Sequence, residues 1–148
     1  MTCGGTVVHF VELGTQRELA ALATKGPALK AVFRPDGKML AVVVSNRVEL
    51  WRWPERTLAG SLEQPAEPLT LVWHPDGRRL ACACSGMTDI LLWDSITGLQ
   101  KFLRGHAELV PHLVFDHRGE LLVSFSWDGS TRFWQASDGE LLFVSRDL

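Results

Sequence analysis

The stretch Leu113-Val114-Phe115-Asp116-His117-Arg118-Gly119-Glu120-Leu121-Leu122-Val123 decides the fold, because the chain carries it in three variant forms. The earlier forms are Ala31-Val32-Phe33-Arg34-Pro35-Asp36-Gly37-Lys38-Met39-Leu40-Ala41 and Leu71-Val72-Trp73-His74-Pro75-Asp76-Gly77-Arg78-Arg79-Leu80-Ala81. Their turn glycines, Gly37, Gly77 and Gly119, are 40 and 42 residues apart. A repeat of about 40 to 45 residues indicates units of four strands each.

A second landmark has the same period. An apolar run ends in tryptophan at Trp51, Trp93 and Trp134, and Val7-Val8-His9-Phe10 fits the same slot with phenylalanine. These four positions are spaced by 41, 42 and 41 residues. Two independent landmarks with one period establish a repeat architecture.

The local chemistry predicts strands. Asp-Gly after an aromatic-ended run favours a tight turn, because glycine adopts positive φ without steric cost. Short β-branched and aromatic runs bounded by such turns are typical of strands. A helical alternative exists only for the short segment 18–23.

These features resemble the WD-repeat β-propellers. The last repeat matches best, with Gly105-His106, Phe115, Ser124-Phe125-Ser126-Trp127-Asp128-Gly129 and Trp134, and the middle repeat adds Trp93-Asp94. The resemblance implies an all-β fold of blades with four antiparallel strands.

The resemblance also implies a hydrogen-bonded network in the last blade. Its members would be His106, Ser124 (or Ser126), Asp128 and Trp134. A connected polar network locks outer strands onto a blade, because buried polar groups need partners. The middle blade keeps Asp89 and Trp93, and the first full blade keeps Asn46 and Trp51, but both lack the Gly-His pair. We expect apolar packing to dominate there.

The repeat divides the chain into a half-blade of two outer strands over 1–25 and three blades over 26–64, 65–104 and 105–148. Propellers usually close with four to eight blades. We therefore expect an open arc, a fragment or truncated relative of a longer propeller. Its open faces would make it self-associate or depend on the missing blades.

Composition narrows the function. The net charge of −2 argues against nucleic-acid binding, which needs a basic patch. The N-terminus lacks a signal peptide and no apolar run is long enough for a membrane helix, so we expect a cytoplasmic protein. We interpret the three cysteines (Cys3, Cys82 and Cys84) as small core residues in a reducing compartment, without a bound metal.

No motif for catalysis or for a cofactor is present. His74 and His117 lie in repeated turns, which predicts exposed side chains, and His9 and His112 lie in strands without evident partners. A propeller-type enzyme would need metal ligands on its inner strands, whose polar candidates are Lys30, Thr70 and His112. These three residues are not a set of side chains that would bind a metal ion, so an enzyme is the least favoured hypothesis.

The favoured hypothesis is a non-catalytic scaffold for a protein or peptide partner. The alternative is a regulatory or sensor segment of a larger signalling protein, such as a kinase fusion. Trp127, in the turn before Asp128, is the candidate anchor, although an aromatic here could instead pack on a neighbouring loop. Arg132 is a second candidate if it converges with Arg47 and Arg52; otherwise the three are solvated strand positions.

Overall fold

The computed structural model describes residues 2–12 and 14–146, and every regular element in these ranges is a strand. The strands form four antiparallel sheets, each made of segments that follow one another along the chain. This confirms the prediction of an all-β fold. The helical alternative for 18–23 is wrong, because Glu18–Ala23 is strand β3. No helix that could cross a membrane occurs in the described ranges.

Three of the sheets have four strands in sequence order. The second sheet consists of β4 (Ala28–Phe33), β5 (Met39–Val44), β6 (Arg47–Arg52) and β7 (Thr57–Glu63). The third consists of β8 (Pro68–Trp73), β9 (Arg79–Cys84), β10 (Ile90–Asp94) and β11 (Gln100–Leu103). The fourth consists of β12 (His112–Phe115), β13 (Leu121–Phe125), β14 (Ser130–Gln135) and β15 (Leu141–Arg146).

The first sheet has three strands, where the sequence predicted two. Strands β2 (Val7–Val11) and β3 (Glu18–Ala23) were expected, and β1 (Thr2–Gly4) adds to the free edge of β2. Gly5 makes the tight turn between β1 and β2 with a φ of 67°. Short segments rich in glycine lack the β-branched pattern that marks a strand, so β1 gave no signal. This sheet lacks only the counterpart of the innermost strand.

Strand pairing also corrects the alignment of Phe10 with the repeated tryptophans. Val8 pairs with Leu22 as Val48 pairs with Leu62, so Val11, not Phe10, occupies the position of Trp51. A shift of one residue reverses the face of a strand. Phe10 accordingly packs toward the second sheet, against Phe33 and Trp53.

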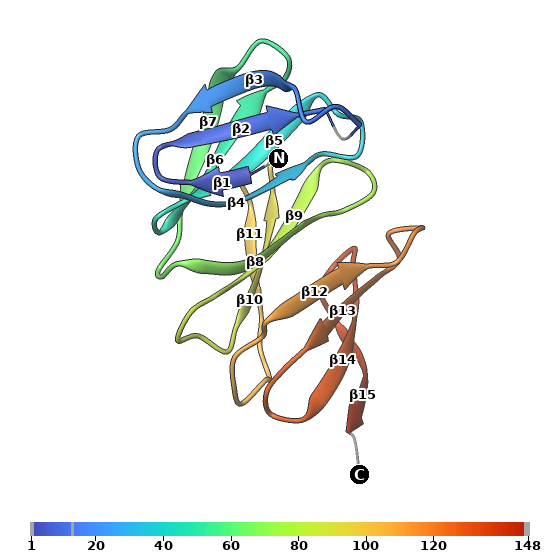
Figure 1. Ribbon diagram of the computed structural model, residues 1–148. Helices are drawn as coiled ribbons and strands as arrows, with labels where there is room; N and C mark the ends of the chain where they lie inside the picture. The colour runs from blue at the N-terminus through green and yellow to red at the C-terminus, as the bar shows by residue number, and fades with distance from the viewer. Residues whose placement is uncertain (1, 13, 147–148) are drawn as a thin grey trace.

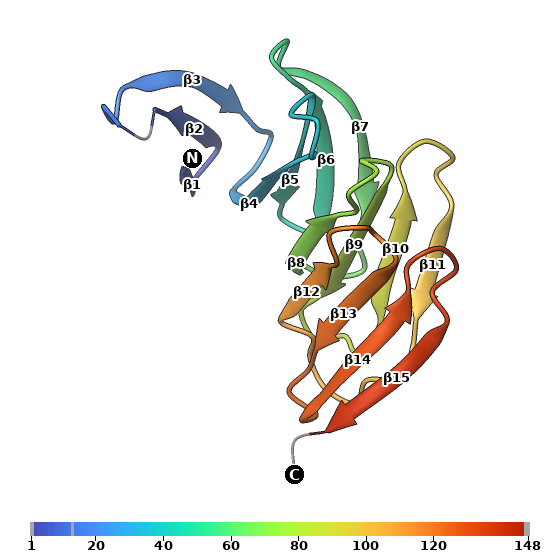
Figure 2. The same cartoon turned by 90° about the vertical axis from the view of Figure 1, so that its right-hand side faces the viewer.

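The sheets stack face against face in an open arc (Figures 1 and 2). A separate apolar cluster fills each of the three junctions between consecutive sheets. The inner strands β4, β8 and β12 contact one another in order along the arc. The first and last sheets lie at opposite ends, so the described part of the chain does not close into a ring (Figure 2).

The outer face of the last sheet is apolar and uncovered. Val114, Phe125 and Phe143 are 45%, 42% and 60% exposed. The counterparts of Val114 and Phe125 on the second and third sheets belong to the apolar clusters at the next junction: Val32 and Val43 on the second sheet, Val72 and Ala83 on the third. This end of the arc therefore presents the kind of surface that blades elsewhere in the chain bury.

Candidate functional site

The last sheet contains the predicted polar network. Asp128 lies 3.0 Å from Nδ1 of His106, and Nε2 of His106 lies 2.7 Å from the Ser124 hydroxyl. The Trp134 indole donates to that hydroxyl oxygen at 2.8 Å. The distances fit one continuous direction of donation, from Trp134 to Ser124 to His106 and, through Nδ1–H, to Asp128. The structure thus brings together all four residues that the resemblance implied.

Asp128 is the most heavily bonded member of this network. Its carboxylate accepts hydrogen bonds from the amides of Ala107 and Ser130 and from the Ser130 hydroxyl. Partial burial opposes ionisation, but the bonds from Ser130, Ala107 and His106 outweigh it and hold the pKa of Asp128 well below its usual range. The loop after β11 is therefore fixed to the β13–β14 turn by an ionised carboxylate.

Trp127 lies in that turn and points outward. Its backbone is held firmly, since its amide donates to the Leu109 carbonyl at 3.0 Å. The preceding residue, Ser126, donates its hydroxyl to the Glu108 carbonyl at 3.1 Å. The Trp127 side chain is nevertheless 70% exposed. A fixed backbone with a free indole is the arrangement expected of a preorganised anchor.

Arg132 lies on β14, two residues after the start of that strand. Its guanidinium rests directly on Gly105, where an added Cβ would collide with Nη1. Gly105 has a φ of 144°, which also favours glycine at this position. Arg47 and Arg52 lie at opposite ends of β6 in another sheet, so the basic cluster that could have included Arg132 does not form.

The third sheet replaces the network with a weaker one that the sequence analysis missed. Gln64 occupies the place of His106, and its Oε1 accepts from the thiols of Cys82 and Cys84 at 3.4 and 3.8 Å. Its Nε2 is buried with no partner among the described residues. The cysteines are free and buried, as expected for small core residues, while the side chain of Cys3 lies outside the described part of the structure.

Asp89 and Trp93 do not join an equivalent network. The Asp89 carboxylate lies 3.3 Å from Nε of Arg104, and Trp93 packs in the apolar cluster between the second and third sheets. In the second sheet, Trp51 donates its indole N–H to buried Glu49 at 3.1 Å, and Arg47 donates to the same carboxylate at 2.9 Å. The second and fourth sheets therefore give the tryptophan N–H at this position different acceptors, Glu49 and Ser124.

The prediction that the His74 side chain is exposed is wrong, because its ring is buried. Nε2 lies 2.7 Å from the Gly119 carbonyl of the neighbouring sheet, and the ring packs edge-on against Phe115. Gly119 admits the imidazole only because it has no Cβ. The amide of Asp76 donates to Nδ1 at 3.1 Å. His117, in the matching turn, is exposed as expected.

Arg79 completes a polar clasp between the third and fourth sheets. Its guanidinium binds Asp76 at 3.1 Å and donates to the carbonyl of Ala136. Partial burial raises the pKa of Asp76, but hydrogen bonds from the Arg78 amide and the Arg79 side chain outweigh this and lower it to about 2. The ionised Asp76 holds the Arg79 guanidinium in the position from which it reaches the Ala136 carbonyl of the fourth sheet.

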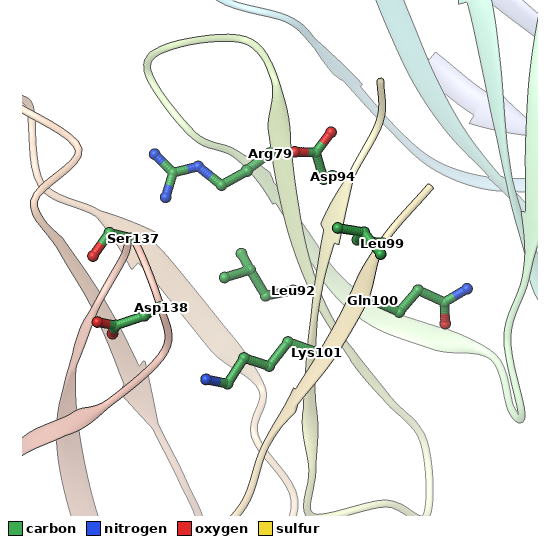
Figure 3. A pocket seen from close by; sticks show the side chains of 8 residues that line it. All are labelled: Arg79, Leu92, Asp94, Leu99, Gln100, Lys101, Ser137 and Asp138. Atoms are coloured by element: carbon green, nitrogen blue, oxygen red, sulfur yellow. The ribbon is translucent and has the colours of Figure 1, made fainter. Parts of the chain in front are cut away.

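A groove of about 300 Å³ adjoins this clasp (Figure 3). Leu92 points into it, Lys101 and Leu99 come from the third sheet, and Asp138 comes from the β14–β15 turn. Its walls carry charges of both signs. The groove therefore shows no preference for a ligand of one charge.

The structure places the three candidate channel residues in different surroundings. Lys30 donates to the Leu69 carbonyl, Thr70 is buried and His112 is exposed. His9 finds a partner in Glu18, at 3.2 Å on the surface. Across those same ranges, no group of three or more histidine, cysteine, aspartate or glutamate side chains is arranged to hold a metal ion.

Residues 97–135, which run from the β11 hairpin through β14, match the family model described as "WD domain, G-beta repeat". These residues therefore form a WD repeat. The matched WD repeat contains the complete polar network, from His106 to Trp134. The other repeats, which have lost parts of that network, keep the same strand order.

Two curated proteins are similar to this chain. Ribosome assembly protein 4 of Chaetomium thermophilum is 39% identical over 54 residues, which is 34% of this chain and 10% of that protein. Protein ROOT INITIATION DEFECTIVE 3 of Arabidopsis thaliana is 34% identical over 129 residues, which is 84% of this chain and 29% of that protein. The chain thus spans less than a third of the length of either relative.

Proposed function

We propose that this chain is a non-catalytic scaffold that binds a protein or peptide partner through the rim formed by the β13–β14 turn and the loop 104–109. The observation that carries the proposal is the side chain of Trp127, which is 70% exposed on a backbone held by hydrogen bonds of its own amide and of Ser126. Tryptophan is enriched at interface hot spots, because it buries a large area and loses little side-chain entropy.

The WD repeat over residues 97–135 supports this proposal through the fold alone, since one fold can host many functions. The similarities to ribosome assembly protein 4 and ROOT INITIATION DEFECTIVE 3 cover a minority of those proteins and single out no partner. The proposal therefore rests on Trp127 and the loop that holds it. Its exposed indole, the fixed loop and the adjacent Arg132 form a surface suited to recognition.

The test replaces Trp127 by alanine in the full chain. Proteins captured from cells by the wild-type chain are compared with those captured by Trp127→Ala, and the captured partner is then purified for affinity measurements. We expect the loss of a central hot spot, about 2 kcal/mol or more, which is roughly a thirtyfold rise in Kd. The melting temperature should not change, because the ring is exposed.

Ile96→Ala is the matched control. Ile96 is 75% exposed, is also apolar, and lies in the β10–β11 turn, remote in sequence from the proposed rim. If both variants bind the partner as tightly as the wild type, or lose binding equally, Trp127 is not the anchor and the proposed surface is wrong.

A further inference from the structure

Arg132 differs from most arginines of this chain because no carboxylate lies within 4.0 Å of its guanidinium in the described ranges. Carboxylates within 4.0 Å neutralise six others, and Arg56 donates to a backbone carbonyl. Arg132 has no such ion pair in the described ranges, and its Nε is buried without an acceptor there. The Arg132 side chain as a whole is partly exposed, and without a carboxylate partner its guanidinium has N–H groups that can donate to an anionic oxygen.

The position of Arg132 relates it to Trp127 through one loop. Gly105, at the start of the loop 104–109, lies under the Arg132 guanidinium. Leu109, at its other end, accepts the Trp127 amide hydrogen bond at 3.0 Å. Between them, His106 and Ala107 are tied to Asp128. The Arg132 guanidinium therefore contacts one end of this short loop, and the backbone of Trp127 is hydrogen-bonded to the other end.

We propose that this rim binds an acidic peptide segment, placing a carboxylate on the guanidinium of Arg132 and a neighbouring apolar side chain on the indole of Trp127. The inference rests on the proposed function and specifies the chemistry of the partner. A guanidinium presents parallel N–H donors that match the two oxygens of a carboxylate. Tryptophan and arginine together are the commonest hot-spot residues.

The surrounding charges favour a single carboxylate over a polyanion. Glu108 lies in the loop and Asp89 pairs with Arg104 at its start, and the whole chain carries a net charge of −2. A nucleic acid needs several cations aligned along its backbone, which this rim lacks. One carboxylate can approach Arg132 while the rest of the peptide contacts the indole.

The experiment uses a random peptide library displayed on phage and selected on the full wild-type chain. We expect selected peptides to be enriched in aspartate or glutamate next to an apolar residue. A synthetic peptide of the selected sequence should bind Arg132→Gln roughly tenfold or more weakly than the wild type, because one partner of a charged pair is missing. Arg118→Gln, which removes an exposed arginine from another turn, should bind as the wild type does.

A peptide with its acidic residue changed to glutamine separates direct pairing from a folding defect. It should lose affinity for the wild-type chain and lose little for Arg132→Gln. Acidic enrichment that survives Arg132→Gln, or a peptide whose phosphoserine version binds more tightly, overturns the inference and leaves the scaffold proposal intact. Failure of the wild-type chain to retain any peptide better than a Trp127→Ala, Arg132→Gln double variant overturns both.

Discussion

The Asp128 carboxylate joins two loops at one end of the last sheet. It links the loop after β11 to the β13–β14 turn through His106, Ala107 and Ser130. Replacing it by alanine leaves these donors without an acceptor in a largely buried place. We expect Asp128→Ala to lower the free energy of unfolding by about 1–3 kcal/mol, measured by urea denaturation.

Asp138→Ala is the comparison for that measurement. Asp138 also accepts an amide hydrogen bond within a turn, from Glu140, but it is exposed and touches no network. It should lower stability by about 0.5 kcal/mol or less. Equal losses for the two variants would show that the Asp128 network adds nothing beyond an ordinary turn.

The same residues predict a loss of stability in acid. Burial, more than any other cause, lowers the pKa of His106 below its ordinary 6.5, so the folded chain favours the neutral imidazole. The stability that this preference contributes is fully present above pH 6.5, and it is lost as the pH falls below 6.5 and the folded chain is forced to take up the proton. The lowered pKa of Asp128 also makes the folded chain less stable in acid, as the pH falls below 3.8, the ordinary pKa of an aspartate.

We therefore expect the melting temperature of the wild-type chain to fall as the pH is lowered from 6.5, a fall measurable by circular dichroism. His106→Gln should be less stable at neutral pH and should show a shallower fall between pH 6.5 and the range where carboxylates titrate. A variant with the same slope as the wild type in that interval would assign the titration to other groups.

The network residues were predictable because the WD-repeat motif places them at fixed positions along the sequence. His74 and Gln64 were not. The turn that contains His74 resembles the exposed turn of His117, and only the arrival of Gly119 from the next sheet buries its ring. Gln64 has a polar side chain in an unremarkable loop, and its burial depends on two cysteines eighteen and twenty residues away.

Strand β2 shows how a repeat can be correct while its register is not. The period of 41 residues placed Phe10 in the tryptophan slot. Pairing with β3 places Val11 there instead. Both alignments give an apolar strand of the same length. Periodicity alone cannot separate positions 10 and 11, because Phe10 and Val11 are both apolar.

A pair of substitutions on β2 tests this register. Phe10 is 6% exposed and packs on Trp53, so Phe10→Ala should cost about 3–5 kcal/mol of unfolding free energy. His9 lies on the opposite face, and His9→Ala should change stability by about 0.5 kcal/mol or less. The reverse order, measured by chemical denaturation, would restore the alignment of Phe10 with the tryptophans.

The arc as a whole leaves apolar surface at its last sheet. Val114, Phe125 and Phe143 are each more than a third exposed, whereas sheets inside the arc bury the same face. We expect the isolated chain to self-associate at micromolar concentration, as determined by analytical ultracentrifugation. A double variant, Phe125→Glu with Phe143→Glu, should shift the chain toward the monomer because charge replaces the contact surface.

Ile96→Glu is the control for that shift, since it adds charge to an apolar side chain that is more exposed but stands apart from the last sheet. It should leave the association unchanged. A wild-type chain that sediments as a 16.5 kDa monomer would show that the uncovered face does not drive contact between copies.

The clasp formed by His74 and Arg79 has a consequence for cooperativity. In repeat arrays each unit contacts only its neighbours, so the strength of each interface decides how strongly adjacent units unfold together. Here a buried imidazole and a guanidinium of the third sheet are satisfied by carbonyl groups of the fourth. Detaching the fourth sheet would break both hydrogen bonds in addition to the apolar contacts of the junction. We therefore expect the third and fourth sheets to unfold together.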